Sequence, residues 1–324
     1  MKVYNLSKPG DIANLTINNI ELSKINAEDA HIVHEYLTVN HTDLHHIEGA
    51  LPLPEGTTTP GYAAIGFVHD AGIEVEHLNY NDRVVYATGP YGAYAEERYI
   101  HPKHLVNVPE DLNNRDVAAI FSKAMTAHYL LFRTFRVTYK HYVLVQGASG
   151  AVGQMLCRWA KHLGAFVIGT VSTEEKAQVA KNCGCDHVVI YTKENYAQEI
   201  IDITKNTGVD VVFDMVGQAT YESSLYCITA YGMLVLVGSA SGNVTNIDPN
   251  VLRQRCVFVT CPRLEVYKMR REELILSANE VFNKLRDKVI VPQFYEYKFD
   301  QIPQALNDIK SRALAGSPIV KLGE

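Results

Sequence analysis

Short strand-like runs of apolar and polar residues, separated by turns, fill the chain from residue 15 to residue 109. Residues 30–36 and 82–86 are examples, and short runs rich in β-branched and aromatic residues between turns predict β-strands. Glycines punctuate this half at intervals that suit the bends and bulges of a curled sheet better than any helical period. We therefore expect a first domain that is mostly β-sheet.

The pattern changes in the middle of the chain. Residues 115–135 have helical apolar spacing, and after residue 138 apolar strands alternate with amphipathic helices. The expected strands are residues 142–146, 166–171, 187–190, 209–214, 233–237 and 257–261, and the expected helices are residues 151–163, 174–182, 196–207 and 220–229. Repeated strand–helix–strand units with right-handed crossovers predict a parallel, doubly wound α/β sheet.

The last part of the chain predicts a helix, a strand, a second helix and a final strand, at residues 271–285, 294–299, 302–311 and 319–322. The pattern alone leaves two placements open for this tail. It could return to the first domain, or it could pack on the second.

Composition narrows the class of protein. A chain of 324 residues favours two domains, since single cores stop growing near about 250 to 300 residues. With 47% hydrophobic and 20% charged residues, and no apolar run near the roughly 18 residues of a membrane span, we expect a soluble enzyme. Residues 1–6 run directly into polar sequence without the apolar core of a secretory signal, so we expect a cytoplasmic location. A net charge of −6 without basic blocks disfavours nonspecific nucleic-acid binding.

The strongest motif is an apolar strand, residues 143–146, that runs into glycines spaced three apart and then into a helix. Glycine permits a tight turn and close backbone approach to a pyrophosphate. The amides and dipole at the helix N-terminus offset the phosphate charge. This context predicts a dinucleotide site at Gly147, Gly150, Ala151, Val152 and Gly153.

The residues at the end of the second strand indicate which dinucleotide binds. An acidic residue about 20 positions after the glycines would hold the ribose of NAD, but the strand ends at Ser172. Ser172 can donate a hydrogen bond to a 2′-phosphate, and Lys176 can supply positive charge. We therefore predict NADPH as cofactor. The alternative is that Lys176 is only a solvated helix residue.

Several stretches resemble the zinc-free quinone oxidoreductases, the group of the medium-chain dehydrogenase/reductase superfamily that includes zeta-crystallin. Besides the dinucleotide turn, they are residues 92–96, 169–177, 209–217, 238–242 and 311–313. The resemblance implies a GroES-like β-barrel domain (residues 1–122, completed by 265–324) and a Rossmann domain (residues 123–264). It also implies an active site in the cleft between these domains, and a homodimer.

The same resemblance implies roles for individual residues. Asn40 and Thr126 are expected near the nicotinamide, and Tyr191 and Arg312 are expected with Ser172 and Lys176 around the adenosine 2′-phosphate. The loops that follow the fourth and fifth strands of the second domain are expected beside the cofactor. The residues expected to contact it there are Gly217, Gly238, Ser239 and Ser241.

No zinc site is expected. Zinc alcohol dehydrogenases of this superfamily have a cysteine near Asn40, a Gly-His-Glu near Gly61 and four structural cysteines in the first domain. This chain has Asn40, then Gly61-Tyr62-Ala63, and its first cysteine is Cys157. His41, His45 and His46 are alternative ligands only if they share a face with a third group.

Without zinc to polarise a carbonyl, an electron-poor acceptor is the natural substrate. We predict NADPH-dependent reduction of quinones by hydride or electron transfer. His45 stands where many bacterial relatives have tyrosine, and it either contacts the acceptor as hydrogen-bond or proton donor or is a passive loop residue. Tyr129 is a second candidate, with a packed aromatic residue as the alternative.

Two rival functions remain. The same architecture could reduce the carbon–carbon double bond of an enone or alkenal. The other rival is a nonenzymatic protein that binds NADPH or, like some relatives of zeta-crystallin, RNA. The excess of acidic over basic residues disfavours RNA binding.

Overall fold

The computed structural model describes residues 1–53 and 56–323. The chain divides into two compact units, which we describe one at a time. Unit 1 contains residues 1–122, 268–286 and 292–324, and unit 2 contains residues 123–267 and 287–291. Among the described residues, no helix has the length and apolarity required to cross a membrane.

The units differ from the expected domains at two short segments. We expected the whole of residues 265–324 to complete the first domain, but residues 265–267 and 287–291 belong to unit 2. The Tyr267 ring accounts for the first segment, because it stacks on Tyr129 of the same unit with ring centroids 4.5 Å apart.

Unit 1 is built on a seven-stranded sheet in the order β14-β15-β3-β4-β5-β7, with β6 also paired to β3. The strands are β3 (Ala30–Thr38), β4 (Ala63–Ala71), β5 (Arg83–Tyr86), β6 (Glu97–Ile100), β7 (Val106–Asn107), β14 (Phe294–Lys298) and β15 (Ser317–Lys321). A separate pair is formed by β1 (Lys2–Leu6) and β2 (Leu15–Asn19). The helices are α1 (His41–Ile47), α9 (Arg271–Arg286) and α10 (Ile302–Lys310).

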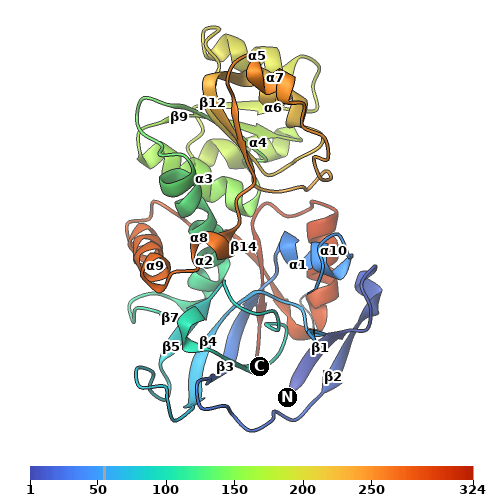
Figure 1. Cartoon of the computed structure of the whole chain (residues 1–324), viewed down its shortest axis with the longest axis vertical. Helices are drawn as coiled ribbons and strands as arrows, with labels where there is room; N and C mark the ends of the chain where they lie inside the picture. The colour runs from blue at the N-terminus through green and yellow to red at the C-terminus, as the bar shows by residue number, and fades with distance from the viewer. Residues whose placement is uncertain (54–55, 324) are drawn as a thin grey trace. The chain divides into compact units, whose positions relative to one another are not determined.

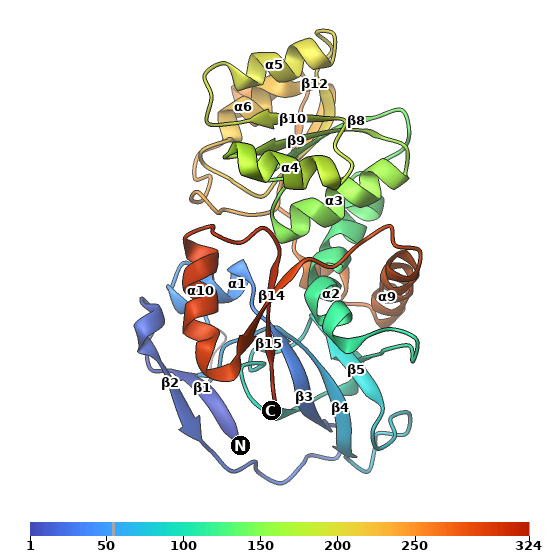
Figure 2. The same ribbon diagram turned by 180° about the vertical axis from the view of Figure 1, so that it is seen from behind.

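The C-terminal strands belong to the sheet of unit 1. Strand β15 pairs antiparallel with β3, Val320 opposite Leu37, and β14 pairs parallel with β15. Figure 2 shows β14 and β15 beside β3 and β4. Of the two placements that the pattern left open for the tail, the strand pairing selects the return to the first domain.

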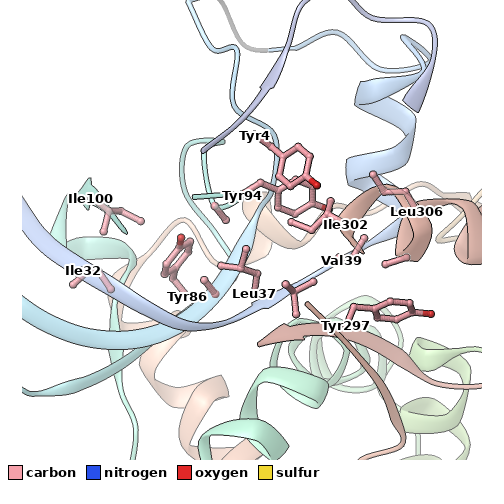
Figure 3. Close-up of a cluster of buried hydrophobic side chains, with 14 of the residues drawn as sticks. Tyr4, Ile32, Leu37, Val39, Tyr86, Tyr94, Ile100, Tyr297, Ile302 and Leu306 are labelled. Carbon is pink, nitrogen blue, oxygen red and sulfur yellow. The ribbon is translucent and has the colours of Figure 1, made fainter. Parts of the chain in front are cut away.

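Burial of apolar side chains holds this arrangement together. Strand β3 alternates buried and more exposed residues in its first half, as the period-two pattern predicts. Its inward side chains join residues from the chain's two ends in one core, drawn in Figure 3. Among the labelled members are Tyr4, Leu37, Tyr94, Ile302 and Leu306.

Unit 2 is built on a six-stranded sheet in the order β10-β9-β8-β11-β12-β13, in which every pair is parallel. Counted from β8, this is the order 3-2-1-4-5-6 of a Rossmann fold. The strands are β8 (Tyr142–Gln146), β9 (Phe166–Val171), β10 (His187–Ile190), β11 (Val209–Asp214), β12 (Ile228–Leu236) and β13 (Phe258–Thr260). The helices are α3 (Ala151–His162), α4 (Glu174–Asn182), α5 (Tyr196–Ile203), α6 (Tyr221–Cys227), α7 (Pro249–Arg253) and α8 (Leu264–Tyr267).

Crossover helices cover this sheet (Figure 1). Leu144, Ile168 and Val212, from neighbouring strands, pack with residues of α5 and α6 in one apolar cluster. The order of strands reverses direction between β8 and β11, and such a switch point is where open α/β sheets bind ligands at the carboxyl ends of the strands. The fold therefore predicts a ligand site at the loops after β8 and β11.

Some predicted boundaries were wrong. Helix α5 ends at Ile203 rather than at residue 207, because Lys205 and Asn206 take left-handed backbone angles in a turn. The predicted helix at residues 220–229 ends at Cys227, and β12 begins at Ile228, five residues early, because Ile228 pairs with Val209 of β11 ahead of a shift in register. Helix α2 (Asn114–Tyr129) crosses the boundary between the units and continues as a π-helix, Leu130–Thr134.

Candidate cofactor and active site

The glycine turn after β8 has the geometry of a phosphate cradle. Gly147 has a φ of +79°, a left-handed value that favours glycine. Its amide and that of Ala148 both donate to the carbonyl of Thr170, at 3.1 and 2.9 Å. A Cβ atom on Gly153 would lie 2.3 Å from the carbonyl oxygen of Gly147. The third glycine is therefore required for the helix to pack closely on the turn.

Helix α3 begins immediately after this turn. Gly150 is its N-cap, and the amide of Gln154 donates to the carbonyl of Gly150 at 2.9 Å. The amides of Ala151, Val152 and Gly153 precede that bond, and amides at these positions have no acceptor within their own helix. Together with the positive end of the helix dipole, they form a site suited to an anion.

Asp214 holds the loop after β11. Its carboxylate accepts hydrogen bonds from the amides of Val216 and Gly217, at 2.8 and 2.9 Å, and from the hydroxyls of Thr220 and Ser224. Burial raises the pKa of this carboxyl, and these donors oppose the rise by favouring the charged form. Asp214 therefore organises the loop after β11.

A buried chain of polar side chains links that loop to the neighbouring strands. The Ser224 hydroxyl accepts from the Gln146 amide at 3.0 Å, and the Gln146 oxygen accepts from the Thr170 hydroxyl at 2.5 Å. This chain ties β9, β8 and α6 together directly beneath the glycine turn. Gln146 was not among the residues predicted from the sequence. A polar glutamine at the end of an otherwise apolar strand does indicate a buried hydrogen bond.

The loops after β11 and β12 are packed against each other. A Cβ atom on Gly217 would lie 2.6 Å from the carbonyl oxygen of Gly242, and one on Gly238 would lie 2.8 Å from that of Met215. The Ser241 hydroxyl donates to the carbonyl of Val216 at 2.7 Å and accepts from the amide of Ala219. The hydroxyl of Ser241 therefore links the two loops. Ser239 lies in the same loop as Ser241 and is partly exposed.

Three of the four residues expected around a 2′-phosphate lie at one corner of unit 2. Ser172 follows β9, and Tyr191 follows the adjacent β10, its amide donating to the carbonyl of Val171 at 3.0 Å. Lys176 is in the first turn of α4, whose N-cap is Thr173. All three side chains are partly exposed. The structure thus brings them to the carboxyl edge of two neighbouring strands.

A charge pair lies beside this corner. Lys193 forms an ion pair with Glu174 at 2.9 Å, which partly neutralises a carboxylate in the first turn of α4, the turn that also contains Lys176. The fourth expected residue, Arg312, belongs to unit 1, where it is exposed after α10 with a φ of +58°. Its role at the phosphate stays a prediction.

In unit 1, Asn40 is the N-cap of α1. Its backbone amide donates to the buried carboxylate of Asp43 at 2.8 Å, and its side chain donates to the carbonyl of Thr38 at 3.2 Å. The hydroxyl of Ser122 donates to the Asn40 side-chain oxygen at 3.3 Å. Asn40 is therefore fixed in orientation and partly exposed.

His45 lies within α1, so the description of it as a loop residue was wrong. The capping of α1 by Asn40 and Asp43 explains why residues 41–47 become helical. The His45 ring is 6.3 Å from the His41 ring, centroid to centroid, as expected for positions four apart on a helix. Burial lowers the pKa of His45, and the Glu48 carboxylate opposes this effect.

Thr126 and Tyr129 lie in the part of α2 that belongs to unit 2. Thr126 is partly exposed, whereas Tyr129 is 2% exposed and stacks on Tyr267. Burial also raises the pKa of Tyr129. The packed-aromatic alternative therefore describes Tyr129 better than a catalytic role, and we leave it out of the proposed site.

Among residues 1–53 and 56–323, no group of three or more histidine, cysteine, aspartate or glutamate side chains is arranged to hold a metal ion. Asn40 and Tyr62 occupy the positions where zinc alcohol dehydrogenases of the superfamily have ligands.

Comparison with known proteins places the chain in a family. A family model described as an alcohol dehydrogenase GroES-like domain matches residues 26–110, and one described as a zinc-binding dehydrogenase matches residues 151–271. Quinone oxidoreductase 1 of Escherichia coli is 35% identical over 286 residues, which cover 87% of this chain and 88% of that protein. The chain belongs to the quinone oxidoreductase family.

Two further comparisons extend this result. The crystal structure of an Escherichia coli quinone oxidoreductase complexed with NADPH has a TM-score of 0.96 and 32% identity, and the match covers 99% of this chain and 100% of that one. The 2-haloacrylate reductase of a Burkholderia species is 36% identical, over 78% of each chain. The predicted combination of a GroES-like and a Rossmann domain is confirmed for this family member.

Proposed function

We propose that this protein catalyses the NADPH-dependent reduction of quinones. The observation that carries the proposal is the glycine cradle at the switch point of a Rossmann sheet, in a chain that resembles quinone oxidoreductases over most of its length. NADPH supplies a hydride, and the protein contributes binding, orientation and exclusion of water.

The residues of unit 2 fit a phosphorylated dinucleotide. Gly147 and Gly153 bring the turn and helix close enough for the backbone to face a pyrophosphate, and the amides of Ala151 and Val152 supply donors. Ser172, Lys176 and Tyr191 line the corner where an adenosine 2′-phosphate would lie, with Arg312 as the fourth predicted member. The absence of a carboxylate at the end of β9 favours NADPH over NADH.

We propose that Asn40 and Thr126 contact the nicotinamide end. Asn40 is oriented by Thr38, Asp43 and Ser122, so its amide can hold a carboxamide without reorganising. A quinone can delocalise the negative charge that a hydride brings, so reduction needs no Lewis acid. The zinc-free character of the enzyme is part of this proposal, and metal analysis of the purified protein tests it.

We assign His45 to the acceptor as a neutral hydrogen-bond donor. Burial lowers its pKa, so the imidazole is uncharged near neutral pH and keeps one N–H to donate. A donor aimed at the quinone oxygen stabilises the charge that develops there. This role differs from release of a proton by an imidazolium ion.

One comparison concerns the alternative function, reduction of a carbon–carbon double bond. The similarity to a 2-haloacrylate reductase suggests that a member of this fold reduces an activated carbon–carbon double bond, as an enone or alkenal reductase would. Parallel NADPH oxidation assays with 9,10-phenanthrenequinone, 1,4-benzoquinone, a 2-alkenal and 2-chloroacrylate separate the two. We expect kcat/KM to be highest for a quinone, and a higher value for either alkene would overturn this assignment.

Three further predictions accompany this function. We propose a homodimer, which sedimentation at several protein concentrations tests. We propose a cytoplasmic location, which fractionation of the source cells tests. The nonenzymatic RNA-binding alternative predicts a nucleic-acid mobility shift at physiological salt, and we expect none, because the net charge is −6.

A further inference from the structure

One aromatic cluster in unit 1 has no part in the function proposed so far. The ring of Tyr62 meets that of Tyr91 edge-on, with centroids 4.9 Å apart and an interplanar angle of 87°. Tyr91 in turn meets the ring of His46, at 4.5 Å and 62°. Tyr91 and His46 are each 5% exposed, whereas Tyr62 is partly exposed. Tyr62 is thus the accessible end of a stack whose inner members are buried.

The cluster lies along the helix that Asn40 caps. The Tyr91 hydroxyl donates to the carbonyl of Thr42 at 3.5 Å, and its ring contacts His46. Thr42 and His46 are four residues apart and therefore share one face of α1. Asn40 lies two residues before Thr42 and starts the helix. The aromatic stack is consequently adjacent to the residue that we assign to the nicotinamide end.

The backbone around Tyr62 is rigidly held. Gly61 has a φ of +96°, and a Cβ atom there would lie 2.3 Å from the Tyr94 ring. The amides of Gly92 and Ala93 donate to the carbonyl of Gly61, at 3.1 and 3.2 Å. Tyr94 itself donates to Asp43 of α1 at 3.0 Å. The Tyr62 ring is therefore presented from a fixed support and loses little conformational freedom when a ligand packs on it.

We propose that Tyr62 is a specificity-determining residue that packs against the ring of the acceptor and favours flat aromatic quinones over open-chain alkenals. An electron-rich phenol ring attracts an electron-poor quinone ring by offset stacking or edge-to-face contact, beyond the burial of apolar area. An alkenal has no ring to place against it. The inference rests on the proposed function, and it narrows the acceptor to compounds that present a flat quinone ring to Tyr62.

The test compares KM and kcat for 9,10-phenanthrenequinone and for a 2-alkenal at saturating NADPH. In Tyr62→Ala we expect the KM for the quinone to rise about three- to tenfold, with kcat, the KM for NADPH and the KM for the alkenal nearly unchanged. Tyr62→Phe keeps the ring and should retain the wild-type KM. Tyr62→Leu keeps apolar volume but has no ring, so its KM for the quinone should rise as in Tyr62→Ala. This variant serves as the test if Tyr62→Ala fails to fold.

Tyr80→Ala is the matched control, since Tyr80 is a 76% exposed tyrosine of the same unit, and its quinone KM should not change. An unchanged quinone KM in Tyr62→Ala and Tyr62→Leu, or an equal rise for the alkenal, overturns the inference and leaves the proposed function intact. A wild-type protein that oxidises NADPH with neither acceptor overturns the proposed function, and the role of Tyr62 with it.

Discussion

Gly147 and Gly153 approach so closely that the carbonyl oxygen of Gly147 would lie 2.3 Å from a Cβ atom on Gly153. The same Cβ atom would lie 2.9 Å from the Cα atom of Ala148. Because these contacts are with backbone rather than with flexible side chains, the turn cannot accept a larger residue without moving.

We therefore expect Gly153→Ala to displace the turn. It should lower the free energy of unfolding by roughly 1–3 kcal/mol through overpacking and weaken NADPH binding by about tenfold or more, because the helix amides move away from the pyrophosphate. Urea unfolding and calorimetric titration with NADPH measure the two effects.

Gly150→Ala is the matched control for stability. Its Cβ atom would meet only the carbonyl oxygen of Gly147, at 3.3 Å, and its φ of −72° is accessible to alanine. We expect nearly wild-type stability with weaker NADPH binding, since the added methyl group lies at the N-cap of α3, next to the amides predicted to bind the pyrophosphate. Wild-type stability in Gly153→Ala would contradict the steric account of the turn.

The corner formed by Ser172, Lys176 and Tyr191 should determine the choice of dinucleotide. Lys176→Ala removes the predicted charge-assisted contact to the 2′-phosphate, so KM for NADPH should rise about tenfold, while KM for NADH, which lacks that phosphate, should stay the same. Lys181→Ala, in the last turn of the same helix, should change neither value. An equal rise for both dinucleotides would show that Lys176 has only a structural or general electrostatic effect.

The Rossmann unit could be predicted closely from sequence, because its signals are local. Strands β8, β9, β10 and β11 coincide with the predicted runs, since each is a short apolar segment between turn residues. The glycine spacing located the cradle for the same reason. The start of β12 was missed because a left-handed Tyr231 lets one strand continue through residues that fit a helix pattern.

Features that depend on contacts distant in sequence were harder to predict. The pattern of residues 319–322 could not show that β15 would pair with β3. The polar chain from Asp214 through Ser224 and Gln146 to Thr170 joins four positions, of which the outermost, Gln146 and Ser224, are 78 residues apart in the sequence. The helical state of His45 depends on the capping of α1 by Asn40 and Asp43, a hydrogen-bonded pair that the apolar pattern does not reveal.

His45 provides a prediction about pH. Because burial lowers its pKa below the ordinary value of 6.5, the imidazole is already neutral at pH 7, and kcat/KM for the quinone should be constant from pH 7 to pH 8. His45→Phe removes the donor and should lower kcat/KM by about tenfold. A wild-type rate that rises as the pH falls through 6.5 would instead identify an imidazolium proton donor, and unchanged turnover in His45→Phe would dismiss both roles.

His34 predicts how the stability of unit 1 depends on pH. The buried ring bonds to the carbonyl of Ala95 at 2.8 Å and to the hydroxyl of Tyr86 at 2.9 Å, which fixes a neutral tautomer. Burial lowers its pKa from 6.5 to about 3. Below pH 6.5 the unfolded chain takes up a proton that the folded chain does not, so the stabilisation present above that pH is lost as the pH falls towards 3.

The loss attributable to His34 approaches about 1.4 kcal/mol per pH unit within this window. We expect the free energy of unfolding to fall from pH 7 to pH 5 in the wild type and to fall less steeply in His34→Asn, although the variant is less stable at pH 7. Equal slopes for the two proteins in urea unfolding would show that His34 does not carry the effect.

The most direct test of the whole account is the steady-state oxidation of NADPH and NADH with 9,10-phenanthrenequinone, on protein dialysed against a chelator. The account predicts saturation by NADPH, a kcat/KM about tenfold or more above that for NADH, and a rate that chelation leaves unchanged. No saturable use of NADPH, a preference for NADH, or loss of activity on chelation that added zinc restores would contradict it.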